Sequence, residues 1–209
     1  MEQKQINLSA LDHLLEELAK KNWAISEEVF TPEFCRDLAH ECQKLSERGQ
    51  LQKASIGHGS SKILDNEIRG DFTLWLDEKS SSSVQQSFLA ALEQIRQELN
   101  RFFFLGLKRV ECHFALYPPK AGYEKHIDNH RGLNHRKITF VLYLNENWQS
   151  GDGGELSIYN PENDSEVIAQ VIPRLGTLIL FRSELFPHQV EKSAAFRMSL
   201  TGWFRDDAL

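Results

Sequence analysis

Apolar residues recur every three or four positions in three stretches of the first half of the chain, which is the pattern of amphipathic helices. The three apolar stripes are Leu8, Leu11, Leu14, Leu15 and Leu18; Phe34, Leu38, Cys42 and Leu45; and Phe88, Leu92, Ile95 and Leu99. Thr31 before Pro32 is typical of a helix start, with threonine as the N-cap and proline at the first helical position. We therefore expect three helices, each with one face against a core.

From residue 108 onward the apolar period changes to two, as in strands with one buried face. The alternating apolar series are Val110, Cys112, Phe114 and Leu116, and then Ile138, Phe140, Leu142 and Leu144. Further strand-like segments are "GELSIYN", "SEVIAQVIP", "GTLILFRS" and "FRMSLTGWFRD". Many short strands separated by polar turns predict an antiparallel sandwich or barrel. Helices followed by strands predict an α+β fold, namely a double-stranded β-helix (jelly-roll) core with the N-terminal helices packed on one sheet.

The length of 209 residues, 41% of them hydrophobic, suits one substantial core. We expect a single domain over 1–209, in which residues 1–107 are mainly helical support and residues 108–209 form the jelly-roll catalytic core. The segment of about 49–82 is rich in Gly, Ser and charged residues. It predicts a long mobile loop with room for a short hairpin, and a loop of this length calls for a functional explanation.

Composition excludes several classes of protein. Cys35, Cys42 and Cys112 are an odd number without CxxC spacing, which argues against a disulfide framework and a thiolate zinc site. No apolar run approaches the roughly 20 residues of a membrane span, and a net charge of −6 offers no basic footprint for nucleic acid. We expect a soluble, cytoplasmic protein without membrane or nucleic-acid partners.

The sequence "YEKHIDNH" contains the residues for a metal site. A helical HExxH zinc site would need Glu where Ile127 stands. In an extended strand, His126 and Asp128 are two positions apart and point to the same side. His188, in "FPHQV", is a candidate third ligand. Two histidines and one carboxylate on one face of an ion are typical of non-haem Fe(II) oxygenases.

Arg197 lies in the apolar segment "AAFRMSLTGWF" and needs an anionic partner if it is buried. Its guanidinium binds a planar carboxylate through two parallel hydrogen bonds. A dicarboxylate such as 2-oxoglutarate could chelate the iron at one end and contact Arg197 at the other. One coordination position would then be left for dioxygen.

These residues resemble the Fe(II)/2-oxoglutarate dioxygenases, and specifically the prolyl 4-hydroxylase group, which includes the oxygen-sensing prolyl hydroxylases of animals and their bacterial relatives. The resemblance covers roughly residue 49 to the C-terminus. It is carried by "GQL", "IRGD", "YPPKAGYEKHIDN", "RKITFVLYLN", "GGEL", "PHQV" and "FRMSLTGWF". The long insert "QKASIGHGSSKILDNE" and the short C-terminus depart from the animal enzymes, so the identity of the substrate does not transfer.

The resemblance implies a role for each motif residue. His126, Asp128 and His188 are the implied iron ligands. The residues implied to bind 2-oxoglutarate are Arg197, Tyr143, Tyr117 and Thr201. Those implied to shape the substrate side of the pocket are Arg69, Asp71, Trp75 and Trp203.

The implied reaction is hydroxylation of a prolyl residue in a protein, with Fe(II), 2-oxoglutarate and O2 as cofactor and cosubstrates, ascorbate as an optional addition, and succinate and CO2 as products. A translation component is one candidate for the protein substrate. Two alternatives stay open. One is an oxygenase for a small molecule, free amino acid or nucleobase, and the other is a catalytically inactive jelly-roll binding module.

The other histidines have simpler interpretations. We expect His13 and His40 on solvent-facing helix surfaces, His58 in the Gly/Ser loop, and His130 and His135 beside the metal motif without binding it. His113 alternates with the apolar series, so we expect it on the other side of its strand. We expect "GDGGEL" to form a tight hairpin turn rather than a phosphate loop, because no helix follows it.

Overall fold

The computed structural model describes residues 5–54, 68–77, 82–129, 134–149 and 151–208. Much of the expected mobile loop, residues 55–67 and 78–81 with His58, lies outside the described residues, as does His130.

The three expected helices are confirmed as α1 (Leu8–Lys21), α2 (Pro32–Glu47) and α3 (Ser83–Phe103). Thr31 caps α2 as expected, because its hydroxyl accepts a hydrogen bond from the Phe34 amide at 3.3 Å. Asn7 and Ser82 cap α1 and α3 in the same way. In the described part of the chain, no helix combines the length and the apolar character that a membrane crossing requires.

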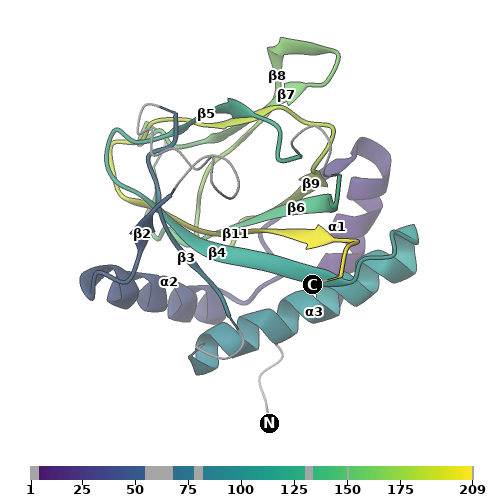
Figure 1. Ribbon diagram of the computed structural model, residues 1–209, viewed down its shortest axis with the longest axis horizontal. Coiled ribbons are helices and arrows are strands. Elements are labelled where there is room, and N and C mark those ends of the chain that lie inside the picture. Colours follow the sequence, from purple (N-terminus) through teal and green to yellow (C-terminus); the bar gives the residue numbers. More distant parts are fainter. Residues whose placement is uncertain (1–4, 55–67, 78–81, 130–133, 150, 209) are drawn as a thin grey trace.

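Eleven strands form two antiparallel sheets in the described residues, which confirms the expected α+β jelly roll (Figure 1). The larger sheet has the order β1-β9-β6-β11-β4-β3-β2, and the smaller sheet has the order β5-β10-β7-β8. The strands are β1 (Trp23–Ser26), β2 (Gln52–Lys53), β3 (Phe72–Trp75), β4 (Arg109–Tyr117), β5 (Tyr123–His126), β6 (Arg136–Tyr143), β7 (Leu156–Asn160), β8 (Asn163–Val171), β9 (Leu178–Arg182), β10 (His188–Val190) and β11 (Arg197–Arg205).

The helices cover one face of the larger sheet, and the smaller sheet faces its other side (Figure 1). The even-numbered apolar residues of β4, such as Phe114 and Leu116, pack against the helices. The odd-numbered Ala115 and Tyr117 face the space between the sheets. Alternation of side chains along the strands therefore gives the protein two separate cores, and the functional residues belong to the inner one.

The N-terminal half contributes more than helical support, because β1, β2 and β3 extend the larger sheet at both edges. In β2 and β3, Gln52 lies opposite Thr73 and Lys53 opposite Phe72. This pair is antiparallel, but residues 54–71 separate its strands, so it is not a short hairpin. Residues 72–75 of β3 lie beside β4, and Arg69 forms a bridge with Tyr123 of β5.

The prediction of a hairpin turn at "GDGGEL" is wrong, because the strands on either side of this segment, β6 and β7, belong to different sheets. The segment instead crosses from one sheet to the other. Gly153 has a positive φ of 74°, and a Cβ there would lie 2.4 Å from the Lys192 carbonyl oxygen. Glycine is needed at this position because the turn packs backbone to backbone against the segment before β11.

Candidate functional site

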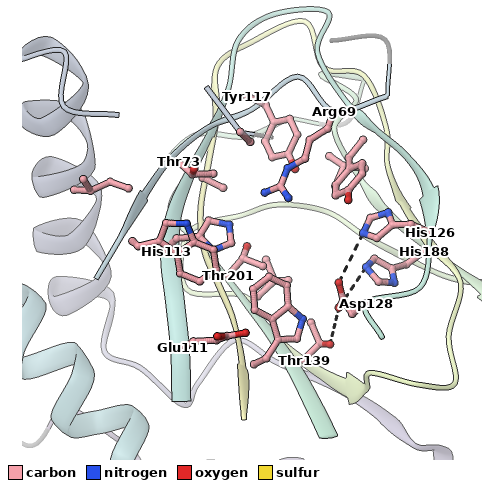
Figure 2. Close-up of a pocket in the computed structure, with 18 of the residues that line it drawn as sticks. Arg69, Thr73, Glu111, His113, Tyr117, His126, Asp128, Thr139, His188 and Thr201 are labelled. Atoms are coloured by element: carbon pink, nitrogen blue, oxygen red, sulfur yellow. Dashed lines mark hydrogen bonds and ion pairs between the residues drawn. The ribbon is translucent and has the colours of Figure 1, made fainter. Parts of the chain in front are cut away.

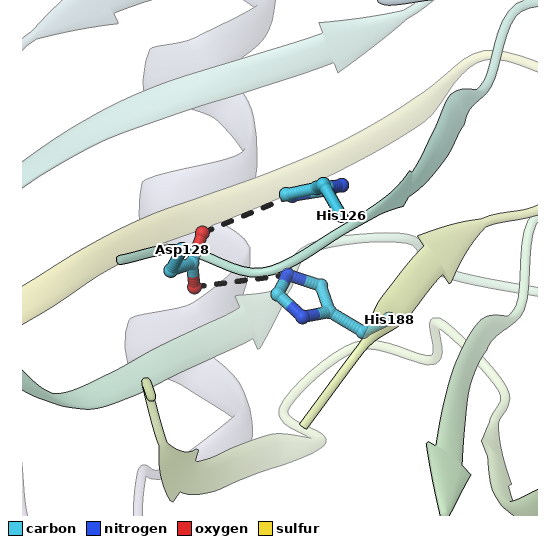
Figure 3. Close-up of side chains that lie close together, drawn as sticks. All are labelled: His126, Asp128 and His188. Atoms are coloured by element: carbon cyan, nitrogen blue, oxygen red, sulfur yellow. Dashed lines mark ion pairs between the residues drawn. The ribbon is translucent and has the colours of Figure 1, made fainter. Parts of the chain in front are cut away.

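His126, Asp128 and His188 converge between the two sheets (Figure 3). His126 ends β5 and His188 begins β10, and the two residues lie opposite each other in the antiparallel pair. Asp128 Oδ1 is 3.8 Å from His126 Nε2, and Asp128 Oδ2 is 3.6 Å from His188 Nε2. The three side chains can therefore each offer one atom to a common cation.

The strand expected to carry both His126 and Asp128 is shorter than predicted. β5 ends at His126, and Asp128 lies in a bend two residues later. The bend still brings the carboxylate to the same side as the imidazole. The pairing of β5 with β10, rather than strand alternation alone, thus brings the three side chains together.

Backbone carbonyls fix the tautomers of both histidines. His126 Nδ1 lies 2.7 Å from the Glu124 carbonyl oxygen, and His188 Nδ1 lies 3.0 Å from that of Phe186. A carbonyl oxygen only accepts hydrogen bonds, so each Nδ1 carries the proton and each Nε2 keeps its lone pair. Both lone pairs lie on the side of Asp128, as metal ligation requires.

The charge states also suit a divalent cation. Burial and the neighbouring His188 lower the pKa of His126 to about 3, so its imidazole is neutral near pH 7. Burial acts to raise the pKa of Asp128, but attraction to the two imidazoles and a hydrogen bond from Thr139 hold that pKa below its ordinary value. Thr139 Oγ1 donates to Asp128 Oδ2 at 2.7 Å. A buried carboxylate and two imidazoles fit Fe(II) in donor type.

A second cluster of possible ligands, His135, Asp206 and Asp207, does not share these properties. Asp206 Oδ1 lies 2.9 Å from His135 Nδ1, and Asp206 Oδ2 lies 3.2 Å from Lys137 Nζ. Asp207 is paired with arginines, including Arg205 at 2.8 Å. The carboxylates of this second cluster are already paired with cationic side chains, so the cluster is a surface ion-pair network.

Arg197 begins β11 and is 1% exposed, yet no carboxylate of the described residues lies against its guanidinium. Its Nε donates to the Gly154 carbonyl oxygen at 2.8 Å. The guanidinium carbon lies 5.2 Å from the ring centre of Tyr117 and 5.0 Å from that of Tyr143. A buried, unpaired guanidinium is costly unless an anion completes it, so this is a cradle for a carboxylate.

The Tyr143 hydroxyl adds a second unmet hydrogen bond to this cradle. It is buried without a partner. Burial raises the pKa of Tyr143 to about 12, against the opposing charge of Arg197, so the hydroxyl stays protonated and can donate. Arg197, Tyr117 and Thr201 line the same cavity of about 870 Å³ as the three candidate metal ligands. The cradle and the metal cluster therefore share one continuous space.

Arg69 and Asp71 form a largely buried ion pair in which only Arg69 reaches the cavity. Arg69 lines the cavity, whereas Asp71 is fully buried behind it and accepts two hydrogen bonds from Arg69, at 2.7 and 3.0 Å. The Arg69 guanidinium lies 4.9 Å from the ring centre of Tyr123, which stacks on His126 at 3.7 Å. Asp71 therefore holds Arg69 in place, and Arg69 in turn supports the wall next to a candidate metal ligand.

Trp75 and Trp203 both line the cavity, as expected of residues that shape its mouth. Trp75 is 52% exposed and Trp203 is 6% exposed. The Arg136 guanidinium lies 3.6 Å above the Trp203 ring and donates to Glu111 at 3.0 Å. Arg136 and Glu111 also line the cavity, and neither was among the residues expected there.

His113 was also missed. It faces away from the apolar series of β4, as expected, but this side is the interior of the jelly roll (Figure 2). The sequence does contain a signal for His113. It shares the odd-numbered positions of β4 and β11 with residues that were expected at the site, namely Tyr117, Arg197, Thr201 and Trp203.

The pKa of His113 predicts a pH-dependent stability. Burial and then Arg69 lower this pKa from 6.5 to about 4, and Asp71 opposes the shift. As the pH falls below about 6.5, this histidine becomes protonated in the unfolded chain but stays neutral in the folded protein. The free energy of unfolding therefore keeps its full value above that pH and decreases as the pH drops toward 4. At about pH 5 we expect a loss of about 2 kcal/mol from this residue.

Urea unfolding of iron-free wild-type and His113→Phe protein at pH 7.5 and pH 5 measures this loss. The variant should lose about 2 kcal/mol less than the wild type, whereas the surface variant His13→Phe should behave as the wild type. Equal losses in wild-type and His113→Phe protein would contradict a depressed pKa at this position.

Comparison with known proteins agrees with this geometry. Residues 112–205 match the model of the 2OG-Fe(II) oxygenase superfamily. The chain is 31% identical to human prolyl hydroxylase EGLN3 over 76% of this chain and 67% of that protein. A crystal structure of a Pseudomonas putida prolyl-4-hydroxylase superposes with a TM-score of 0.82 at 38% identity, over 93% of this chain and 98% of that one.

A prolyl hydroxylase from Trichoplax adhaerens, solved with a peptide fragment of the hypoxia inducible factor oxygen degradation domain, superposes with a TM-score of 0.81 at 26% identity, over 94% of this chain and 89% of that one. Other animal relatives are longer. The chain spans 28% of the length of the hypoxia-inducible factor prolyl hydroxylase of Caenorhabditis elegans and 47% of human Egl nine homolog 1.

Proposed function

Because the chain belongs to the 2OG-Fe(II) oxygenase superfamily, within its prolyl hydroxylase group, we propose that it hydroxylates a prolyl residue of a protein substrate. The family uses Fe(II), 2-oxoglutarate and O2, and the reaction forms succinate and CO2. The observation that carries the proposal is a His-Asp-His cluster in the same cavity as a buried arginine that lacks a carboxylate partner in the described part of the protein.

We assign Fe(II) to His126, Asp128 and His188. The distal carboxylate of 2-oxoglutarate is assigned to Arg197 and Tyr143, which have unmet hydrogen-bonding capacity in the right place. Tyr117 and Thr201 line the cavity that contains the iron ligands and Arg197.

The bound iron would supply the activation of dioxygen, which amino-acid side chains cannot perform. The chain's own residues hold and orient the reactants. Glu124 and Phe186 carbonyls fix the two imidazoles, and Thr139 fixes one carboxylate oxygen of Asp128. Apolar side chains of the inner core exclude water from the far side of the cavity, which protects the oxidising reaction from side products.

A protein substrate suits the exposed aromatic side chain of the cavity lining. Trp75 and Trp203 both line the cavity, and Trp75 is half exposed although it is a large apolar side chain. An exposed indole is typical of a surface that contacts a partner. The alternatives of a small-molecule, free amino acid or nucleobase oxygenase, and of an inactive binding module, have no comparable observation in their favour. Ascorbate remains an optional addition to the assay.

We further propose a cytoplasmic location, supported by three buried cysteines that form no disulfide. We propose one domain, with residues 108–209 as its catalytic core. A translation component remains one candidate for the protein substrate, and we expect no nucleic-acid or membrane partner.

Mass spectrometry of proteins from a cell extract tests the proposed reaction. After incubation with the enzyme, Fe(II) and 2-oxoglutarate, we expect a gain of one oxygen atom on a proline, together with an equal amount of succinate. A control without 2-oxoglutarate should show neither. Succinate formation with an oxidised free amino acid or nucleobase, and no modified protein, would favour the small-molecule alternative instead.

A further inference from the structure

His113 has an unmet hydrogen bond that the iron and 2-oxoglutarate assignments do not explain. Its side chain is 1% exposed, and its Nδ1 is buried without a partner. A buried polar atom without a partner costs free energy, which is recovered if a ligand supplies the missing group. The Tyr143 hydroxyl has the same property and already belongs to the carboxylate cradle. Of the cavity-lining residues, His113 and Trp203 each have a buried nitrogen without a partner outside that cradle, and Trp203 Nε1 can only donate.

His113 lies in the middle of a row across three strands. Trp75 of β3 is directly opposite it on one side, and Thr201 of β11 is directly opposite it on the other. The imidazole lies 4.6 Å from the ring centre of Trp75 and 5.7 Å from that of Trp203. In Figure 2, His113 is on the wall away from His126 and His188, with Thr201 close by. A substrate segment that enters past Trp75 toward the metal must cross this row.

Trp75 is the movable part of the row. Its indole packs against the imidazole and is 52% exposed, and β3 has only the two-residue β2 on its outer side. The indole can therefore turn without disturbing the core. Such a movement would widen the space beside the His113 imidazole for a segment bound in the cavity.

The side chains around His113 indicate which chemical group its imidazole would bind. Arg69 and Arg136 line the same cavity but are already paired with Asp71 and Glu111, so neither calls for a ligand carboxylate beside the neutral imidazole of His113. A neutral imidazole has one donor and one acceptor nitrogen. A peptide unit also offers one donor and one acceptor, so it can satisfy Nδ1 in either tautomer. Proline itself lacks an N–H, so the complete peptide unit must come from a neighbouring residue.

We propose that His113 is a specificity-determining residue that hydrogen-bonds a backbone peptide group next to the target proline, between the indole walls of Trp75 and Trp203. This inference rests on the proposed function, since it requires a prolyl substrate. It explains why a histidine with an unmet bond lies in an otherwise aromatic part of the cavity.

Two variants separate hydrogen bonding from ring packing. His113→Phe keeps an aromatic ring between the tryptophans but removes both nitrogens. His113→Asn removes the ring but places an amide close to the position of Nδ1. If His113 binds the substrate, the His113→Phe variant should have a kcat/KM for the peptide about tenfold below that of the wild type. The kcat/KM of the His113→Asn variant should stay within about threefold of the wild-type value.

The probe is a synthetic peptide that contains the proline mapped in the extract experiment. In matched peptides, one flanking amide at a time is replaced by an ester. An ester lacks the amide N–H and its carbonyl is a weaker acceptor, so at one flanking bond it should lower the kcat/KM of the wild type by about threefold to tenfold. The same ester should lower the kcat/KM of His113→Phe no further, because the partner of the replaced amide is already absent. The KM for 2-oxoglutarate shows that each variant has formed its cosubstrate site, and His13→Phe is the surface control.

The outcomes are distinct. Full activity of His113→Phe together with a defect in His113→Asn assigns the residue to ring packing and overturns the proposal. An ester that costs the wild type nothing at every flanking bond also overturns it. If the wild type consumes 2-oxoglutarate with extract proteins but modifies no proline, the proposed function fails first, and the role of His113 fails with it.

Discussion

Asp128→Ala is expected to lower succinate formation by at least about 1000-fold. The substitution removes the only carboxylate among the three candidate ligands and leaves two imidazoles, which hold a ferrous ion weakly. A bound metal supplies several kcal/mol of catalysis, and the loss of about 4 kcal/mol corresponds to a factor of about 1000. Succinate release and iron retained after gel filtration measure the two parts of the effect.

The second cluster provides the matched control for this experiment. Asp206→Ala removes a carboxylate of the other His/Asp cluster, one that pairs with His135 and Lys137 at the surface. We expect wild-type iron binding and turnover in this variant. Iron-dependent turnover at the wild-type rate in Asp128→Ala would show that the ligand assignment is wrong, provided that circular dichroism confirms the fold.

Arg197→Ala is expected to raise the 2-oxoglutarate concentration needed for half-maximal rate by about 30-fold to 150-fold. The guanidinium is buried and has no internal carboxylate partner in the described chain, so it contributes a charge-assisted contact of about 2–3 kcal/mol to the ligand. Titration of the iron-loaded enzyme with 2-oxoglutarate measures this directly, independently of any prolyl substrate.

Arg197→Lys tests the geometry of the contact, because it keeps the charge but loses the planar fork. It should lie between the wild type and the alanine variant. Arg36→Ala is the surface control, since Arg36 only approaches Glu146 at 3.9 Å on an exposed face. An unchanged requirement for 2-oxoglutarate in correctly folded Arg197→Ala would remove Arg197 from the carboxylate site.

The local elements could be predicted because their signals lie within a few residues. The stripe from Leu11 to Leu18 and the Thr31-Pro32 start depend on helical spacing and capping, and both appear in the structure, whereas Leu8 at the start of the expected stripe is 40% exposed. The residues of the metal cluster could also be predicted, because an HxD motif followed by a distant His supplies the donor atoms of a known type of iron site. These predictions needed no knowledge of which strands pair.

Other features depend on contacts between distant segments. Alternation along β4 shows that His113 and Phe114 face opposite sides, but not which side is the inside of the jelly roll, because both faces are covered. The bidentate bond that buries Asp71 behind Arg69 and the crossing of "GDGGEL" between sheets are equally invisible in the sequence.

The sequence by itself thus determined the helices, the strand alternation, the metal-ligand chemistry of His126, Asp128 and His188, and the need of Arg197 for an anion. Only the tertiary structure decided that β5 and β10 pair at His126 and His188, that backbone carbonyls set both tautomers, and that His113 faces the cavity. The physical reason is range: side-chain periodicity is fixed by local backbone geometry, whereas the pairing of strands and the choice of interior face arise from the burial of residues far apart in the chain.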